Sequence, residues 1–136
     1  LADLRSIEPP YESPDVRMAW LIYLLRYYPE RLRNVPRAVF VNALRSEGVR
    51  TSEGGGYQPF HLTELMQMRD FYGKGCPLEC SHVEKAPEYE LGMLPVTESI
   101  GSRLISLAMF ANPVPDMLLD QYIEAFHKVE ENAGEL

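Results

Sequence analysis

The chain has 136 residues, which is the usual length of one domain. Hydrophobic residues make up 46% and charged residues 24%, so the composition excludes disordered, collagen-like and coiled-coil proteins. The net charge of −7 disfavours nucleic-acid binding, because phosphate contacts require basic residues. The longest apolar run, residues 18–25, is shorter than the about 20 residues of a membrane span, and no secretory signal is recognisable. We therefore expect a cytoplasmic protein without nucleic-acid or membrane partners.

Residues 1–15 are rich in proline and acidic residues and show no regular apolar spacing, which indicates a mobile linker leading into a domain over 16–131. Residues 16–27 carry apolar side chains at both alternating sets of positions. This pattern predicts a central strand covered on both faces, with a helix as the alternative. Pro29 ends the element, because proline neither continues a helix nor donates to a sheet.

Residues 35–47 give the clearest helix, with Asn34 as its N-cap and with apolar residues on one face. Gly48 is expected to end this helix in the left-handed conformation. The three consecutive glycines at 54–56 predict a mobile loop. A nucleotide-binding loop is disfavoured there, because the glycines lack a following Lys with Ser or Thr.

The next segment, 63–72, predicts a short helix with Thr63 as its N-cap. Residues 73–95 contain glycines and prolines and are predicted to form a loop, with one turn of helix near 84–89. Residues 97–102 are expected to form a helical turn. The nearly continuous apolar run RLISLAMF predicts a strand over 103–110.

The last helix is predicted over 115–131, where apolar residues recur at helical spacing. They form one stripe, which consists of Leu118, Leu119, Tyr122, Ile123, Phe126 and Val129. We expect this stripe to pack on the sheet that carries Trp20 and Tyr23, and residues 132–136 to form a frayed tail. The order of the elements predicts an α+β domain in which a small sheet is packed by three to four helices.

Cys76, Cys80 and His82 form one cluster of candidate metal ligands, because thiolate and imidazole both bind zinc. Structural zinc sites add a second pair of ligands, which this sequence lacks, so we expect no metal here. The two cysteines are interpreted as ordinary loop residues. A reversible disulfide across the loop is the alternative.

The remaining candidate side chains are histidines and lysines. His61 lies among aromatic residues, and from the residues alone a structural imidazole is favoured over a catalytic one. His127 is interpreted as a surface residue. Lys74, Lys85 and Lys128 lie in polar loops or at a helix end, so none suits a Schiff base, which requires a desolvated amine. The residues alone define no self-contained active site.

Five segments in a fixed order carry a resemblance to a known family. They are AWLIYLLRY with the following P-E-x-L, then FVNALRSEGV, GYQPFH, SRLISLAMF and DQYIEAFHKV. Together they resemble the C-terminal small domain of the DegT/DnrJ/StrS family of pyridoxal-phosphate-dependent sugar aminotransferases, in particular the 3-amino-5-hydroxybenzoic acid synthase branch. The resemblance covers about residues 16–131, and Ala108 departs from it, because the family usually has proline there.

The resemblance implies a fold-type-I enzyme whose large domain is absent from this chain. That domain would supply the Schiff-base lysine and most contacts to pyridoxal phosphate, so we expect no cofactor site here. The P-x-H segment of the family lies near the substrate pocket. The resemblance therefore implies that Tyr57, Phe60 and His61 bind substrate in the intact enzyme.

We accordingly expect the isolated small domain of a sugar-type aminotransferase, inactive alone, whose partner is the large catalytic domain. The intact enzyme, for which a second copy of the chain is a further candidate partner in a homodimer, would move an amino group from an amino acid to a keto-sugar or related ketone. The alternative is a non-enzymatic interaction module that reuses the same small domain. A catalytic domain encoded upstream of Leu1 would favour the enzyme, and a start codon near Leu1 would favour the module.

Overall fold

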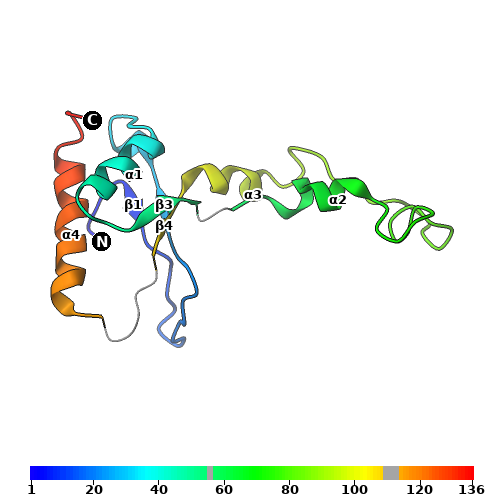
Figure 1. The fold of residues 1–136 in the computed structure, drawn as a ribbon, viewed down its shortest axis with the longest axis horizontal. Coiled ribbons are helices and arrows are strands. Elements are labelled where there is room, and N and C mark those ends of the chain that lie inside the picture. Colours follow the sequence, from blue (N-terminus) through cyan, green and yellow to red (C-terminus); the bar gives the residue numbers. More distant parts are fainter. Residues whose placement is uncertain (55–56, 109–113) are drawn as a thin grey trace. The chain divides into compact units, whose positions relative to one another are not determined.

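The computed structural model describes residues 1–54, 57–108 and 114–136 of an α+β protein, as the order of elements predicts. The chain divides into two units, Leu1–Gly56 with Ser102–Leu136, and Tyr57–Gly101. The first unit contains β1 (Ile7–Glu8), β2 (Tyr23–Tyr27), α1 (Arg37–Ser46), β3 (Thr51–Glu53), β4 (Leu104–Leu107) and α4 (Asp116–Glu131) (Figure 1). The second contains the 3-10 turn η3 (Phe60–Leu62), α2 (Glu64–Met68) and α3 (Pro95–Ile100).

The sheet of the first unit is antiparallel, with the strand order β1-β2-β4-β3. The central strand predicted over 16–27 is confirmed for residues 23–27, because β2 lies between β1 and β4. The predicted cover on both faces is wrong, because Leu25 and Tyr27 are buried whereas Arg26 on the other face is exposed. Residues 16–22 form neither the predicted strand nor the alternative helix. The pairing of β2 with β4 ends at Tyr23 opposite Leu107, so the preceding residues are not held in the described sheet, and Leu21 is 86% exposed.

The strand β3 differs from the sequence prediction, which placed no strand there. It consists of polar residues, and Ser52 pairs with Ser106 of β4, where the two hydroxyl oxygens lie 2.6 Å apart. A polar strand of this length carries no apolar alternation by which it could be recognised. β4 confirms part of the strand predicted over 103–110, of which residues 109–110 lie outside the described residues.

Residues 4–8 belong to the core of the first unit. Leu4 and Ile7 are buried, and β1 pairs with β2 so that Ile7 lies opposite Tyr27. The prediction of a linker over 1–15 is therefore wrong at residues 4–8, because two buried apolar side chains attach this segment to the core without forming a periodic pattern. The mobile loop predicted at 54–56 falls largely on residues 55–56, outside the described residues.

The core of the first unit lies between the sheet and the helices α1 and α4. Leu25, Tyr27 and Ile105 of the sheet belong to the same buried cluster as apolar residues of both helices. The Tyr27 ring stacks on Phe40 of α1 at a centroid distance of 4.7 Å, and Phe40 lies 6.3 Å from Phe126 of α4. This apolar burial is the main favourable contribution to folding of the unit.

The helix α4 confirms the last predicted helix. Only part of its predicted apolar stripe is buried. The buried residues are Tyr122, Ala125, Phe126 and Val129. Leu119 and Ile123 are 41% and 39% exposed, because only the part of the stripe that faces the core is covered. Trp20, expected on the sheet, precedes β2. The predicted frayed tail is wrong at Ala133, which is 7% exposed.

The helix ends agree only in part with the predicted caps. Pro36, not Asn34, occupies the N-cap of α1, and Asn34 has a positive φ of 58°. Thr63 is the N-cap of α2, but its hydroxyl donates to the carbonyl oxygen of Phe60 at 2.8 Å rather than accepting from the helix. Gly48 confirms its predicted left-handed conformation, with a φ of 91°.

The helices of the second unit are short. α2 is shorter than the predicted 63–72, and α3 includes most of the helical turn predicted over 97–102. The turn of helix predicted near 84–89 is not formed. Carbonyl groups there bind side chains instead of helical N–H groups: Arg69 donates to Pro87 O and Gln67 donates to Tyr89 O, both at 3.0 Å.

Candidate functional site

The second unit contains a buried histidine–carboxylate pair. His61 lies on η3 and Glu98 lies on α3, and His61 Nε2 is 2.9 Å from Glu98 Oε1. The two side chains are only 7% and 13% exposed. The Glu98 carboxylate also accepts hydrogen bonds from the backbone N–H groups of Leu94 at 3.0 Å and Gly92 at 2.7 Å.

These donors keep the Glu98 carboxylate ionised. The Leu94 N–H lowers the pKa of Glu98 most, burial raises it, and the Gly92 N–H and His61 lower it further, so the pKa lies below its ordinary value of 4.5. An ionised carboxylate only accepts hydrogen bonds, so Nε2 of His61 carries the proton that faces it. The pair therefore fixes both the position and the orientation of the imidazole.

The other ring nitrogen of His61 is buried without a hydrogen-bond partner within the described residues. Such atoms are rare in folded proteins, and each calls for a partner such as a water molecule or a ligand. The main chain of His61 is also held, because the Gln67 side-chain amide donates to its carbonyl oxygen at 2.9 Å. The imidazole is thus a rigidly placed group with one unused polar atom.

The three residues expected to bind substrate all lie in this unit, in different environments. The Tyr57 hydroxyl donates to the carbonyl oxygen of Thr97 in α3 at 3.0 Å. Its ring lies close to Gly101, where an added Cβ would be 2.8 Å from Cδ1 of Tyr57. His61 is buried, whereas Phe60 is 65% exposed. Tyr57 and His61 therefore both contact the region of α3, and Phe60 presents its ring to solvent.

Sequence reasoning missed Glu98 and Gln67, which hold His61 in place. Glu98 is separated from His61 by 37 positions along the chain, and the sequence predicted only a helical turn around it. No local pattern connects two residues so far apart. The one available signal was a carboxylate in the first turn of a predicted helix, where acidic residues are common for other reasons.

The lysines of the chain do not fit a Schiff-base site for pyridoxal phosphate. Lys74 and Lys85 are exposed, and Lys128 is 62% exposed with its ammonium 2.7 Å from Glu47 Oε2. A Schiff-base lysine requires desolvation that lowers the pKa of its amine, and none of these environments supplies it. No Schiff-base step is therefore assigned to these three lysines.

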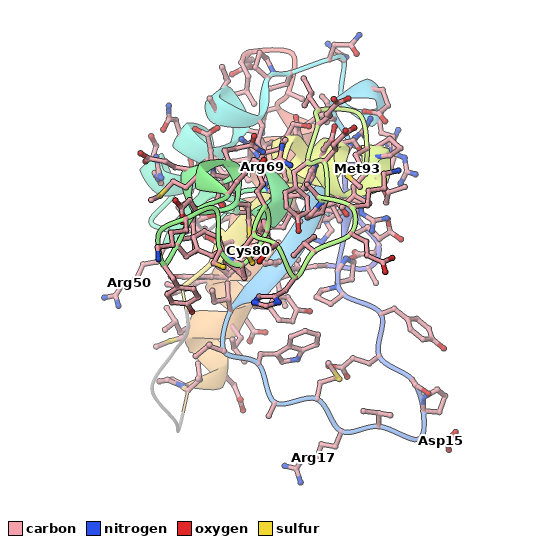
Figure 2. All side chains as sticks on the ribbon, turned by 90° about the vertical axis from the view of Figure 1, so that its right-hand side faces the viewer. Asp15, Arg17, Arg50, Arg69, Cys80 and Met93 are labelled. Atoms are coloured by element: carbon pink, nitrogen blue, oxygen red, sulfur yellow. The ribbon has the colours of Figure 1, made fainter. Side chains whose placement is uncertain are left out.

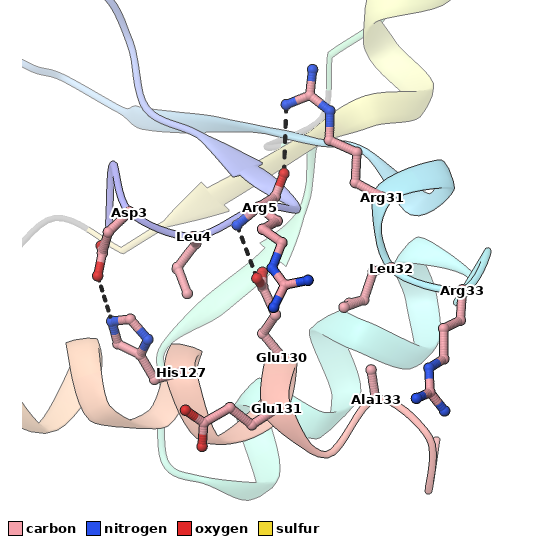
Figure 3. A pocket seen from close by; sticks show the side chains of 10 residues that line it. All are labelled: Asp3, Leu4, Arg5, Arg31, Leu32, Arg33, His127, Glu130, Glu131 and Ala133. Atoms are coloured by element: carbon pink, nitrogen blue, oxygen red, sulfur yellow. Dashed lines mark hydrogen bonds and ion pairs between the residues drawn. The ribbon is translucent and has the colours of Figure 1, made fainter.

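A polar cleft of about 450 Å³ lies in the first unit, where the N-terminal segment meets α4 (Figure 3). The Glu130 carboxylate accepts from the Arg5 N–H at 2.9 Å, and Arg31 donates to the Arg5 carbonyl oxygen at 3.5 Å. His127, predicted to be a surface residue, is 36% exposed and lies 3.1 Å from Asp3. These contacts connect the N-terminal segment with α4 and with Arg31, so we interpret the cleft as a structural junction.

An apolar hollow of about 380 Å³ lies between the start of β2 and residues 119–126 of α4. Trp20, Tyr23, Leu119 and Ile123 are among its lining residues, and Trp20 packs edge-on against Tyr23 at a centroid distance of 5.4 Å. An exposed apolar surface of this kind suits contact with another apolar surface.

Cys76 and Cys80 are both free and partly exposed. Within the described residues, no group of three or more His, Cys, Asp or Glu side chains is arranged to hold a metal ion.

In the part of the chain that the structure describes, no helix combines the length and apolar character needed to cross a bilayer. Neither a protein-family model nor a curated protein matches the chain.

Proposed function

We propose that the chain is the small domain of a pyridoxal-phosphate-dependent sugar aminotransferase of the DegT/DnrJ/StrS type. The intact enzyme transfers an amino group from an amino acid to a keto-sugar or related ketone. The cofactor, bound by the large domain, supplies the electron sink of that reaction. The chain alone is inactive, its partner is the large domain, and the intact enzyme works in the cytoplasm.

The observation that carries this proposal is the coincidence of the resembling segments with the folded elements. Segments AWLIYLLRY, FVNALRSEGV, SRLISLAMF and DQYIEAFHKV contain residues of β2, α1, β4 and α4, respectively. These four elements contribute to one buried core. The fifth segment, GYQPFH, leads into η3 and carries His61.

In this proposal, His61 is the residue of this chain that positions the substrate. The Glu98 carboxylate fixes the imidazole through Nε2, and Nδ1 remains without a protein partner. In the neutral imidazole Nδ1 accepts a hydrogen bond, so it suits a hydroxyl group of a sugar or a water molecule next to it. The proposed role of His61 is positioning, not proton transfer to the cofactor.

The proposal is tested by combining the chain with the large domain encoded upstream of Leu1. The chain alone should be colourless after incubation with pyridoxal phosphate and desalting, and the combined protein should retain the colour and transfer amino groups to keto-sugars. A yellow isolated chain whose colour is lost on replacing Lys74, Lys85 or Lys128 would overturn the proposal. So would an upstream sequence that encodes no such domain.

A pair of matched histidine variants tests the role of His61. In the combined protein, His61→Gln should lower kcat/KM for the ketone about tenfold, as expected for the loss of one hydrogen bond, while the bound cofactor keeps its absorbance. His127→Gln, in the first unit, should leave kcat/KM unchanged. Equal effects of the two substitutions would contradict a substrate-side role for His61.

The second candidate function is a non-enzymatic interaction module, and the apolar hollow beside Trp20 favours it. Leu119 and Ile123 are partly exposed there although they belong to the apolar stripe of α4. A start codon near Leu1, together with an apolar protein partner that protects this hollow from solvent, would support the module. The large-domain experiment therefore separates the two functions.

A further inference from the structure

The two cysteines stand at the ends of a tight turn in the second unit. The Cys76 N–H donates to the Gly73 carbonyl oxygen at 3.2 Å, and the Glu79 N–H donates to the Gly75 carbonyl oxygen at 2.6 Å. Gly75 has a φ of 76°, and a Cβ at this position would lie 3.0 Å from the Glu79 carbonyl oxygen. Glycine is therefore required for the close approach that reverses the chain between the two cysteines.

Residues 69–71, which precede the turn, also contact it and stabilise its conformation. The Phe71 N–H donates to the Cys76 carbonyl oxygen at 2.8 Å, and Asp70 forms a β-bridge with Pro77. Arg69 Nε lies 2.7 Å from Oε1 of Glu79. Arg69 and Cys80 are labelled among the side chains of this unit in Figure 2. These contacts fix the backbone on both sides of the turn.

Both cysteine side chains belong to this turn. The Cys80 thiol folds back towards the turn, with Sγ 3.9 Å from the Pro77 carbonyl oxygen. The neighbouring Cys76 thiol lowers the pKa of Cys80, and the backbone N–H of His82 lowers it further. The Cys80 thiol in turn raises the pKa of Cys76. The lowered pKa of Cys80 favours its thiolate as the attacking group, and Cys76 stands at the other end of the same turn.

We propose that Cys76 and Cys80 form a redox-active dithiol, which small-molecule disulfides such as glutathione disulfide oxidise to an intramolecular disulfide. The Cys80 thiolate attacks one sulfur of glutathione disulfide, the S–S bond breaks, and one glutathione leaves and takes up a proton. Cys76 then loses its proton to solvent and attacks Sγ of Cys80, which forms the Cys76–Cys80 bond and releases the second glutathione. Two protein thiols are oxidised, and one glutathione disulfide is reduced to two thiols.

The proposal does not depend on the aminotransferase assignment, since it concerns only residues of this turn. Two free and partly exposed cysteines at the ends of one turn are accessible to a small oxidant. The disulfide would covalently close the turn from Cys76 to Cys80, which the backbone hydrogen bonds already hold in a bent conformation.

The full chain is reduced, freed of reductant and exposed to glutathione disulfide, and its mass and alkylatable thiols are measured. Oxidation should lower the mass by two hydrogen atoms, remove both alkylatable thiols and give one peptide that links Cys76 to Cys80. The Cys76→Ser variant should stop as a stable glutathione adduct at Cys80. The Cys80→Ser variant should form its adduct several-fold more slowly.

Three results would overturn the proposal. They are two thiols that remain alkylatable in excess glutathione disulfide, separate glutathione adducts on both cysteines, and disulfides between chains in place of the internal one. Circular dichroism of each variant shows whether the chain is folded during the assay. If either variant is unfolded, the comparison is repeated with Cys→Ala at the same position, and equal adduct rates at the two cysteines would then count against the proposal.

Discussion

The core of the first unit depends on Phe126, and Phe126→Ala tests this directly. The Phe126 side chain is 0% exposed and lies 6.3 Å from the Phe40 ring, which in turn stacks on Tyr27. Truncation of a fully buried Phe loses its apolar transfer free energy and leaves a cavity, at a cost of about 3–5 kcal/mol. Small domains are stable by roughly 5–15 kcal/mol, so this loss is a large share of the free energy of unfolding.

The expected effect is measured by thermal and urea unfolding, followed by circular dichroism. For a domain of this size the melting temperature of Phe126→Ala should fall by about 10–20 °C, or the chain should not fold at all. Phe60→Ala is the matched control, because the same truncation at a side chain that is 65% exposed should change stability by less than about 0.5 kcal/mol. A melting temperature of Phe126→Ala equal to that of Phe60→Ala would refute the assignment of this stripe to the core.

Three further substitutions test two contacts that the sequence did not reveal and one backbone conformation that it predicted. Glu130→Ala removes the acceptor of the Arg5 and Ser6 N–H groups and of the buried Ser6 hydroxyl, so urea unfolding should show a loss of about 2–3 kcal/mol. The lowered pKa of Glu98 contributes stability that is fully present above its ordinary value of 4.5 and is lost as the pH falls through the folded value. Glu98→Gln should therefore flatten the acid side of the stability profile measured by urea unfolding. Gly48→Ala forces a side chain into a φ of 91° with nothing within 4 Å of the new Cβ, so chemical unfolding should show a loss of about 1–2 kcal/mol from backbone strain alone.

Each of these predictions has a result that contradicts it. Glu124→Ala, at an exposed position of the same helix, is the control for Glu130→Ala, and equal stability of the two variants would remove Glu130 as an anchor. An acid profile of Glu98→Gln that follows the unchanged chain would exclude a role for this carboxylate in pH-dependent stability. An unchanged stability of Gly48→Ala would mean that α1 can end without the left-handed residue.

The elements with a local apolar period could be predicted from the amino-acid sequence. The helices α1 and α4, the strand β4 and the buried part of β2 follow from the spacing of apolar residues, because burial of one face requires that spacing whatever the partner is. The α+β class and the left-handed Gly48 follow in the same way. Each of these features depends on residues within a few positions of one another.

The strands β1 and β3 and the contacts of His61 and Glu130 depend on pairings between distant parts of the chain, so only the folded structure shows them. Thr51–Glu53 is a strand only because β4 offers it a row of hydrogen-bonding groups, since its own residues are polar. The Glu130 carboxylate meets the Arg5 N–H across 125 positions, and His61 meets Glu98 across 37. Hydrogen bonds have no periodic signature along a chain, so pairings over such separations are set by the folded arrangement of the whole unit and not by local composition.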